Sequence, residues 1–409
     1  MPRPAPAGRS PERLPVEESV IGRQQRKVVH FGAGAVGRGF LGQLYCEAGW
    51  ETVFVDVVRP VIEALSERRA YDLHLATVPE RTVRVSNVRG IDATDIEAVT
   101  REIATADLMS TAVRPSALPA VCVSIARGLE RRCRDGAGPI DILICENLPD
   151  AANHFRGLLS RNVDPAVAQY LQTKVGLVET VISRMVPVVT PEQQASDVLY
   201  VAAEEYAILP VDRDGFVGPA PEIPGLRAVR PFAGHKQRKL CTHNCGHSLF
   251  AYYGSRRGYT YVWEAVEDHG LYDEVLAALD ESGRALIALY GFDPAEHKAH
   301  TEDLLRRFAN RALGDTVARV AREPLRKLGP DERFVGAAKL ALACGIPPVH
   351  LAKGIACALR YETADDEQAR ELAAMLKARG PAHVLESVCK LPPDHPIHRM
   401  VIDTFGKEA

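Results

Sequence analysis

The sequence has no long apolar run and no strong excess of one charge. None of its apolar segments approaches the roughly eighteen residues that a membrane-spanning helix needs, so we expect no membrane partner. The 50 Lys and Arg residues and 53 Asp and Glu residues leave a formal net charge of −3. This balance does not produce the basic surface that binds nucleic acid. We therefore expect no nucleic-acid partner either.

Cysteine is used in a way that does not fit a disulfide framework. The nine cysteines are an odd number, are scattered and lie mostly within apolar runs, as buried thiols in a reducing cytoplasm do. Residues 1–26 contain five prolines among arginines and glutamates but no apolar segment, which is not the pattern of a secretory signal. We expect a cytoplasmic protein with a disordered N-terminal extension over residues 1–26.

A glycine-rich motif follows the first apolar segment. Residues 28–31 lead into Gly32-Ala33-Gly34-Ala35-Val36-Gly37, an expected helix over 38–49 comes next, and the strand-like segment 52–55 ends at Asp56. This order of strand, loop, helix, strand and acid is that of a dinucleotide-binding unit. The first glycine allows a tight turn, the second lets a pyrophosphate approach, and the third lets helix and strand pack closely. A glycine-rich turn in an unrelated α/β protein is the alternative.

Asp56 favours NAD over NADP. It lies nineteen residues after Gly37, where a carboxylate accepts hydrogen bonds from both ribose hydroxyls and repels a 2′-phosphate. The nearby Arg59 weakens this preference. The expected cofactor-binding residues are Phe31, Gly32, Ala33, Gly34, Ala35, Val36, Gly37, Asp56, Thr111, Ala112, Val113 and Asn147.

The length of the chain and its pattern of elements predict two domains. At 409 residues it exceeds the size at which one core stops growing. Apolar strands over 106–113 and 140–145 flank a helix over 116–132, as in a parallel sheet covered by helices. Beyond residue 195, one or two strands over 198–209 precede segments with helical apolar spacing. These predicted helices are 259–268, 271–290, 301–309, 331–344, 348–360 and 367–379.

The predicted fold class is therefore α/β, with an N-terminal Rossmann dinucleotide-binding domain over 27–195 and a mainly helical substrate domain over 196–409. Ligands of open parallel sheets bind beyond the carboxyl ends of the strands. We expect the active site there, between the two domains. Asn147, just after the strand 140–145, could place an amide over the reaction centre, or it could instead cap the helix expected after residue 150.

Lys239, Asn244 and His247 lie within nine residues of one another. In an α-helix Asn244 and His247 share a face, with Lys239 about a turn earlier near that face. A neutral amine that takes a hydroxyl proton and amides that hold the oxygen suit alcohol–ketone chemistry. The ordinary pKa of lysine, ~10.4, has to be lowered for this role, and we expect burial and the adjacent Arg238 to lower it. A solvated helix face is the alternative.

A zinc site would be another use of the same segment. Cys241, His243, Cys245 and His247 alternate at every second residue, but on a helix this spacing turns successive side chains about 200° apart. Zinc ligands are normally paired with gaps of two to four residues. We therefore expect no metal, and a chelator distinguishes the alternatives because it inactivates only a zinc enzyme.

Over residues 27–405 the sequence resembles the mannitol dehydrogenase family of polyol-specific long-chain dehydrogenases/reductases. The family's Lys-x4-Asn-x2-His pattern is met in full by Lys239, Asn244 and His247. The other matching segments are 30–34, 36–40, Cys145-Glu146-Asn147, Arg184-Met185-Val186-Pro187, 310–317, Arg319 and Lys327.

The resemblance implies metal-independent hydride transfer to NAD, with Lys239 as the acid/base. Asn147 and Asn244 would form the oxyanion hole, and His247 would bind substrate hydroxyls. The implied substrate is a sugar phosphate, with D-mannitol 1-phosphate and D-fructose 6-phosphate as the interconverted pair, and the implied state is a monomer or weak homodimer. An unphosphorylated polyol or a hexuronate as substrate, and a catalytically silent NAD-binding protein, remain alternatives.

Phosphate recognition points to a basic stretch, because arginine binds phosphate oxygens in a bidentate way. By resemblance we favour Arg319 and Lys327 near the substrate. The whole stretch is Arg306, Arg307, Arg311, Arg319, Arg322, Arg326 and Lys327. Two residues depart from the family pattern: Arg114 stands where glycine is common, and Ser183 stands where an aspartate usually precedes the arginine. They bring cofactor affinity and the detail of the site into question.

Overall fold

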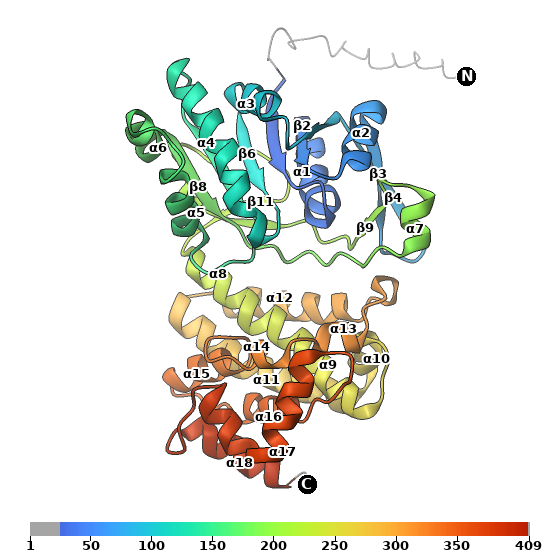
Figure 1. Cartoon of the computed structure of the whole chain (residues 1–409). Helices are drawn as coiled ribbons and strands as arrows, with labels where there is room; N and C mark the ends of the chain where they lie inside the picture. Colours follow the sequence, from blue (N-terminus) through green and yellow to red (C-terminus); the bar gives the residue numbers. More distant parts are fainter. Residues whose placement is uncertain (1–24, 408–409) are drawn as a thin grey trace, which may run out of the picture.

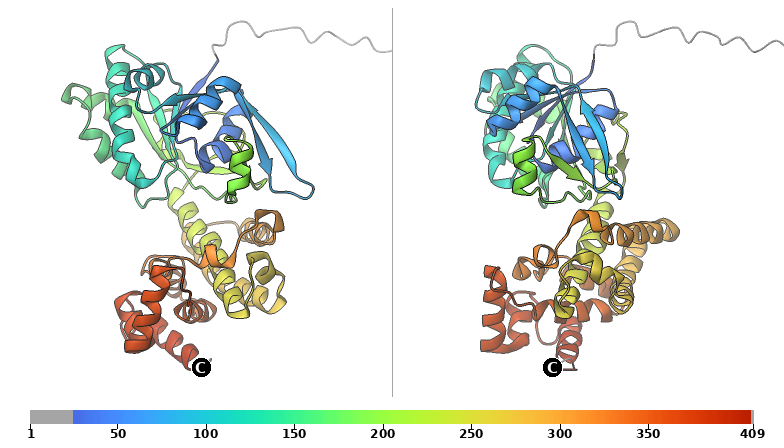
Figure 2. Two further views of the ribbon diagram at one scale, coloured as in Figure 1. Left: turned by 45° about the vertical axis from the view of Figure 1, so that its right-hand side comes forward. Right: turned by 90° about the vertical axis from the view of Figure 1, so that its right-hand side faces the viewer.

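The computed structural model describes residues 25–407. The extension predicted over 1–26 lies, except for its last two residues, outside the described residues. An α/β part formed by the N-terminal half stands above a helical part formed by the C-terminal half (Figures 1 and 2). Helix α8 (Phe232–Arg238) leads from one to the other.

The N-terminal part is built on a six-stranded sheet in the order β5-β2-β1-β6-β7-β8. Every neighbouring pair in it is parallel. The strands are β1 (Lys27–Phe31), β2 (Glu51–Asp56), β5 (Val88–Asp92), β6 (Leu108–Thr111), β7 (Ile140–Ile144) and β8 (Val175–Glu179). This strand order is that of a Rossmann domain, so the predicted fold class is confirmed.

Both faces of the sheet are covered, which explains why its strands are continuously apolar. On β1, Val29 and Phe31 pack with α3, α4, α5 and α6 on one face, while Val28 packs with η1, α1 and β10 on the other. The helices are η1 (Gly37–Leu41), α1 (Gly42–Glu47), α2 (Arg59–Arg68), α3 (Ile96–Ala104), η2 (Pro115–Ala117), α4 (Leu118–Arg134), α5 (Ala151–Ser160), η3 (Pro165–Val167), α6 (Ala168–Lys174) and α7 (Pro191–Ser196).

Two small sheets flank the main one. Strand β3 (Ala70–Leu75) pairs with β4 (Arg81–Ser86) and, from much later in the chain, with β9 (Val201–Ala203). Strand β10 (Leu209–Asp212) pairs with β11 (Leu226–Val229), after the short helix η4 (Arg213–Gly215). Because these late strands pack with the N-terminal part, we propose that the domain boundary falls near residue 230. The boundary at 195/196 followed from the change in pattern alone.

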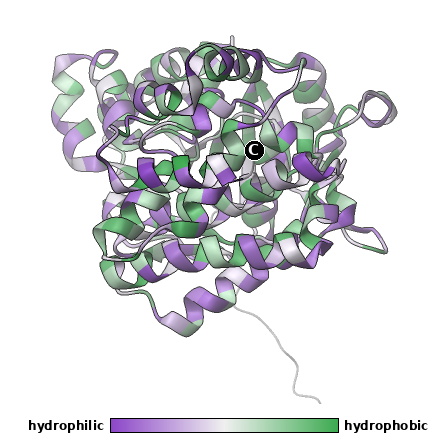
Figure 3. Ribbon diagram, turned by 90° about the horizontal axis from the view of Figure 1, so that it is seen from below, coloured by the Kyte–Doolittle hydropathy of each residue, from purple (hydrophilic) through white to green (hydrophobic). Residues whose placement is uncertain are grey.

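The C-terminal part is helical and has its own core. Its helices, after α8, are η5 (Lys239–Asn244), α9 (Cys245–Arg257), α10 (Val262–Glu267), α11 (His269–Tyr290), α12 (Pro294–Phe308), η6 (Arg311–Leu313), α13 (Val317–Ala321), α14 (Pro324–Lys327), α15 (Val335–Ala343), α16 (Val349–Leu359), α17 (Glu367–Ser387) and α18 (Pro396–Lys407). Seen from below, apolar and polar residues alternate along these helices (Figure 3). Their apolar residues form one buried cluster that includes Phe250, Leu286 and Ile355.

The predicted helices of this part exist, but some of their ends differ. Helix α12 begins seven residues before the expected 301, since the Asp293 side chain accepts from Glu296 N and Pro294 occupies the first turn. Gly380, at φ +75°, interrupts α17 where the sequence predicts an end, and helix resumes beyond it. Helix α18 is not among the predicted ones. No helix within residues 25–407 is long and apolar enough to span a membrane.

Candidate functional site

The loop between β1 and η1 has the shape of a cradle for a diphosphate. Gly32 has φ +105°, and a side chain there would lie 2.5 Å from the carbonyl oxygen of Ala112. A side chain on Gly37 would collide with the carbonyl oxygen of Gly32 and the ring of His30. At Gly34 a side chain would meet nothing within 4 Å, so the loop is open on that side. These residues fit a pyrophosphate placed at the amino end of the helix.

Asp56 lies at the end of β2 and holds this loop. Its Oδ2 accepts a hydrogen bond from the backbone nitrogen of Ala33 (2.7 Å), and its Oδ1 accepts from those of Val57 (2.7 Å) and Val58 (3.1 Å). The carboxylate is therefore fixed beside the place where a ribose would lie. Arg59 is mostly exposed and pairs with Asp92 at 3.1 Å.

The buried Glu146 joins two neighbouring strand ends. It follows β7, and its carboxylate accepts hydrogen bonds from Thr111 Oγ1 (2.7 Å) and Val113 N (2.9 Å), both beyond or at the end of β6. Burial raises the pKa of Glu146, and the two hydrogen bonds oppose this effect. The segment 111–113 is thereby fixed at the carboxyl end of the sheet, where Ala112 lies beside Gly32, and its contact with the cofactor stays a prediction. Glu146 is not among the predicted site residues, although its position directly after a buried strand was a usable signal.

The side chains of Lys239 and Asn147 meet across the two domains. The Nζ of Lys239 donates a hydrogen bond of 3.4 Å to Oδ1 of Asn147. Asn147 does not cap helix α5, because the N-cap residue of that helix is Asp150. With its oxygen facing the lysine, the Nδ2 of Asn147 remains a donor for a substrate oxygen.

The segment 239–244 is a π-helix rather than the expected α-helix, which continues only from Cys245. In a π-helix the hydrogen bonds run from i to i+5, so that each turn is wider. Lys239 and Asn244, five residues apart, therefore lie on the same side. At about 3.6 residues per turn they would be roughly 140° apart. The expected common face is present, but the wider turn is what produces it.

The pKa of Lys239 is lowered from 10.5 to about 8, first by burial and then by the positive charge of Arg333. The expected source, Arg238, is occupied elsewhere. Its guanidinium lies 4.6 Å from the ring centre of Phe292, and its Nη1 donates to Glu296 at 3.3 Å. The lowered pKa suits an acid/base group that works near neutrality. Arg333, distant in sequence and without a motif, carries no sequence signal for this effect.

His247 is held by a carboxylate and an aromatic ring. Its Nε2 lies 2.8 Å from Oδ2 of Asp315, and its ring stacks on Phe308 with centroids 4.7 Å apart. Asp315 also pairs with Arg319. Burial alone would raise the pKa of Asp315, but the contacts with His247 and Arg319 outweigh it, so the pKa is lowered. A charged Asp315 fixes the orientation of the imidazole.

The basic stretch expected over 306–327 does not form one surface. Arg306 pairs with Asp303, Arg307 with the buried Glu204, and Arg311 with Glu267. The remaining four members line the cavity that holds Asn244 and His247; they are Arg319, Arg322, Arg326 and Lys327. Arg319 and Lys327, the two residues predicted to bind the substrate, thus line the same cavity as Asn244 and His247. Of the two departures, Arg114 is exposed, and the backbone oxygen of Ser183 accepts a hydrogen bond from Arg307 (2.6 Å).

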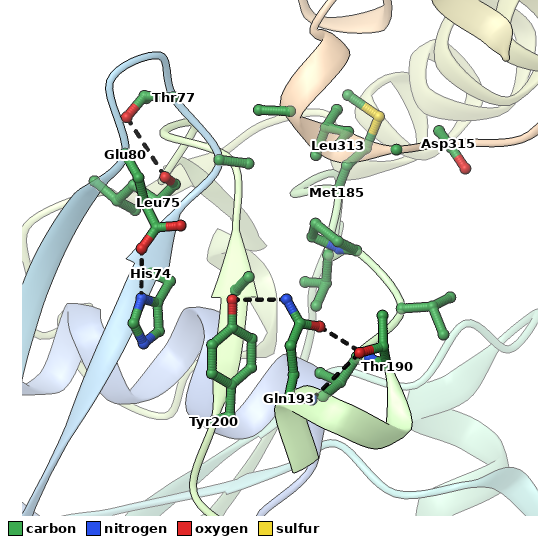
Figure 4. Close-up of a pocket in the computed structure, with 18 of the residues that line it drawn as sticks. His74, Leu75, Thr77, Glu80, Met185, Thr190, Gln193, Tyr200, Leu313 and Asp315 are labelled. Atoms are coloured by element: carbon green, nitrogen blue, oxygen red, sulfur yellow. Dashed lines mark hydrogen bonds and ion pairs between the residues drawn. The ribbon is translucent and has the colours of Figure 1, made fainter. Parts of the chain in front are cut away.

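Two cavities are lined by the predicted catalytic residues, and a third by Asp315, the partner of His247. One of about 380 Å³ is lined by Asn147 and Lys239, and one of about 360 Å³ by His247 and Lys327. Asn244 and Arg333 line both. A third, of about 440 Å³, lies between the sheet of β3, β4 and β9 and the helical part; Figure 4 shows Leu313 and Asp315 of the helical part across from His74 and Tyr200.

The alternating cysteines and histidines do not converge. Cys241 and Cys245 have no exposed surface and belong to the apolar core of the helical part, and His243 packs against Phe308 with centroids 5.5 Å apart. Within residues 25–407, no three His, Cys, Asp or Glu side chains form a group that could hold a metal ion. The absence of a metal requirement remains a prediction.

Asp56→Ala should weaken NAD binding by about ten- to hundredfold and reduce discrimination against NADP, because a hydrogen bond to a charged group contributes about 1.5–3 kcal/mol. The measurement is the Kd for NADH and NADPH by fluorescence titration. Asp107→Ala, which removes an acid at the opposite edge of the same sheet, is the control. An unchanged NAD/NADP ratio in Asp56→Ala would remove Asp56 from the cofactor site.

Two family models match almost the whole described chain. The model described as the mannitol dehydrogenase Rossmann domain matches residues 26–225, and that of the mannitol dehydrogenase C-terminal domain matches residues 229–389. The chain is 38% identical to mannitol-1-phosphate 5-dehydrogenase of Bacillus licheniformis over 375 residues, which is 91% of this chain and 98% of that protein. It is 36% identical to the enzyme of the same name from Brevibacillus brevis, covering 91% of this chain and 96% of that protein.

Solved structures have the same fold. A substrate-free D-sorbitol dehydrogenase superposes with a TM-score of 0.78 at 17% identity, covering 93% of both chains. Mannitol 2-dehydrogenase of Pseudomonas fluorescens, in a ternary complex with NAD and D-mannitol, superposes with a TM-score of 0.69 at 17% identity. It covers 94% of this chain and 92% of that one. At 17% identity, these similarities show a common fold and nothing about the substrate.

Proposed function

We propose, because this chain belongs to the mannitol dehydrogenase family, that it is an NAD-dependent oxidoreductase that interconverts D-mannitol 1-phosphate and D-fructose 6-phosphate. The observation that carries the proposal is the contact of Lys239 Nζ with Asn147 Oδ1, 3.4 Å apart. It joins a lysine of lowered pKa from the helical part to an amide at the end of a Rossmann strand. The names of the relatives at 36–38% identity support the phosphorylated substrate.

The cofactor would be held by the glycine loop, by Asp56 and by the backbone that follows β6. Gly34 leaves the approach to the loop open, and Asp56 offers a charged acceptor to ribose hydroxyls. Bound NAD supplies the hydride acceptor, or NADH the hydride donor. The acid at the end of β2 supports NAD over NADP.

In alcohol oxidation, neutral Lys239 takes the proton of the substrate hydroxyl. In ketone reduction, its ammonium form returns a proton to the carbonyl oxygen. Asn147 and Asn244 donate amide N–H groups to the same oxygen and stabilise its negative charge. His247, oriented by Asp315 at 2.8 Å, binds a neighbouring hydroxyl. No metal enters this scheme, and the resemblance to the family supports a monomer or a weak homodimer.

The phosphate would lie on the far side of Asn244 from Asn147. The cavity of His247 is lined by basic side chains, among them Arg319 and Lys327. Such a lining suits an anionic substrate better than an uncharged polyol. It is the feature that favours the sugar phosphate over fructose.

NADH oxidation with fructose 6-phosphate, fructose and fructuronate tests the proposal. We expect kcat/KM to be largest for fructose 6-phosphate. A preference for fructose or fructuronate would identify an enzyme of the same family with another substrate. No NADH oxidation with any of the three, by protein that binds NADH, would indicate a catalytically silent NAD-binding protein.

The pH dependence should follow Lys239. Since its pKa is lowered to about 8, kcat/KM for oxidation of mannitol 1-phosphate should rise with pH through a midpoint near 8, where the neutral amine becomes the main form. Reduction of fructose 6-phosphate requires the ammonium form and should fall through the same midpoint. Steady-state rates between pH 6 and 10 provide the measurement. A flat oxidation profile across this range would contradict the role of Lys239.

A further inference from the structure

We infer that Arg333 binds the phosphate group of the substrate. The inference rests on the proposed function for the identity of the sugar phosphate, but its physical basis is the position of this arginine. Arg333 precedes helix α15 and lines both the cavity of Asn147 and Lys239 and the cavity of His247 and Lys327. It is the basic residue that reaches both sides of Asn244.

The guanidinium of Arg333 is held in place by two of its nitrogens, which leaves the third available to a ligand. Its Nε donates to Glu332 at 3.2 Å, and its Nη1 donates to Ser248 Oγ at 3.3 Å. Among residues 25–407, its Nη2 has no hydrogen-bond partner. Only 12% of the side chain is exposed, and the residue lines both cavities. A fixed guanidinium with a free edge is a suitable receptor for a phosphate.

Three of the other four basic residues of the cavity, Arg319, Arg326 and Lys327, are engaged by other groups, and the fourth, Arg322, is exposed. The guanidinium of Arg326 pairs with the carboxylate of Glu323 at 2.7 Å and with that of Glu332 at 3.2 Å. The Nζ of the buried Lys327 donates to two backbone carbonyls, those of Val320 and Arg322. Arg319 pairs with Asp315, which in turn holds His247.

Charge supports the same assignment. Glu332 is shared between Arg326 and Arg333, so the wall of the cavity has more positive than negative groups. The positive charge of Arg333 also contributes to the lowered pKa of both Lys239 and Lys327, after burial. A phosphate dianion on Arg333 would relieve this repulsion. Phosphate binding would thereby favour the ammonium form of Lys239, which is the form that donates the proton when the ketone is reduced by NADH.

The test uses the full-length chain and the variant Arg333→Met, which removes the charge but keeps a long apolar stem. We expect the Kd for inorganic phosphate, measured by calorimetry, and the KM for fructose 6-phosphate each to rise about ten- to hundredfold, as for a lost hydrogen bond to a charged group. The midpoint of the pH profile for oxidation should move upward. NADH affinity should stay within threefold of wild type.

Arg284→Met is the matched control, because it removes an exposed arginine of α11 that pairs with Asp280. It should change none of these values by more than threefold. Arg333→Lys keeps the charge without the planar fork and should give an intermediate phosphate affinity, even if Arg333→Met folds poorly. Phosphate affinity within threefold of wild type in both Arg333 variants would overturn the inference. A wild-type protein that binds phosphate but does not reduce fructose 6-phosphate would instead reject the proposed function.

Discussion

Lys239→Ala should lower turnover at least 10²–10⁴-fold in both directions, the range typical of general acid–base catalysis. Lys239 is the titratable group with a pKa near 8 beside Asn147, so its loss removes the proton carrier without touching the glycine loop. The measurement is kcat for fructose 6-phosphate reduction, with NADH affinity determined separately. We expect NADH affinity to stay near wild type and the pH dependence around 8 to disappear.

A second lysine of the same cavity provides the comparison. Lys236 lies three residues earlier, and its amine is engaged by Glu179 at 2.6 Å rather than by Asn147. Lys236→Ala should therefore cost less than tenfold. A small primary amine added to the assay should partly restore Lys239→Ala, in proportion to its concentration. Turnover of Lys239→Ala within a few-fold of wild type would refute the mechanism and restore the view of this segment as a solvated helix.

Asn147→Ala and Asn244→Ala should each lower kcat by about 10²–10³-fold, as does the loss of one oxyanion-hole donor in other enzymes. The two amides come from opposite domains. Asn147 contacts Lys239, and Asn244 lines the same cavity as both residues. Because the charge they stabilise is largest in the transition state, the loss should appear mainly in kcat and less in KM. Steady-state kinetics with fructose 6-phosphate separate the two.

Asn153→Ala is the control for the asparagine variants. Asn153 is exposed on α5 and donates to Asp150 at 2.8 Å, so its removal should leave kcat within about twofold of wild type. If Asn147→Ala or Asn244→Ala raised KM with kcat unchanged, that residue would bind the substrate in its ground state. Its assignment to the oxyanion hole would then be wrong.

The Rossmann domain could be predicted from the sequence because its signals are local. A tight turn requires positive φ, and Gly32 has φ +105°. The strands buried on both faces are short apolar runs, and Asp56 ends β2 as the motif predicts. The strands β9 to β11 could not be assigned in the same way. Whether a short strand joins one domain or the other depends on its partner, and β9 pairs with β3, more than a hundred residues earlier.

In the candidate site, the sequence by itself determined the residue types and their order: a glycine loop ending in an acid, and a lysine, an asparagine and a histidine within nine residues. Only the tertiary structure decided how they act together. It placed Asn147 against Lys239 and formed the π-helix that brings Lys239 and Asn244 to one side. It also substituted Arg333 for Arg238 as the charge near the lysine. Distances between residues far apart in the chain, and the burial that lowers a pKa, exist only once the two domains have packed.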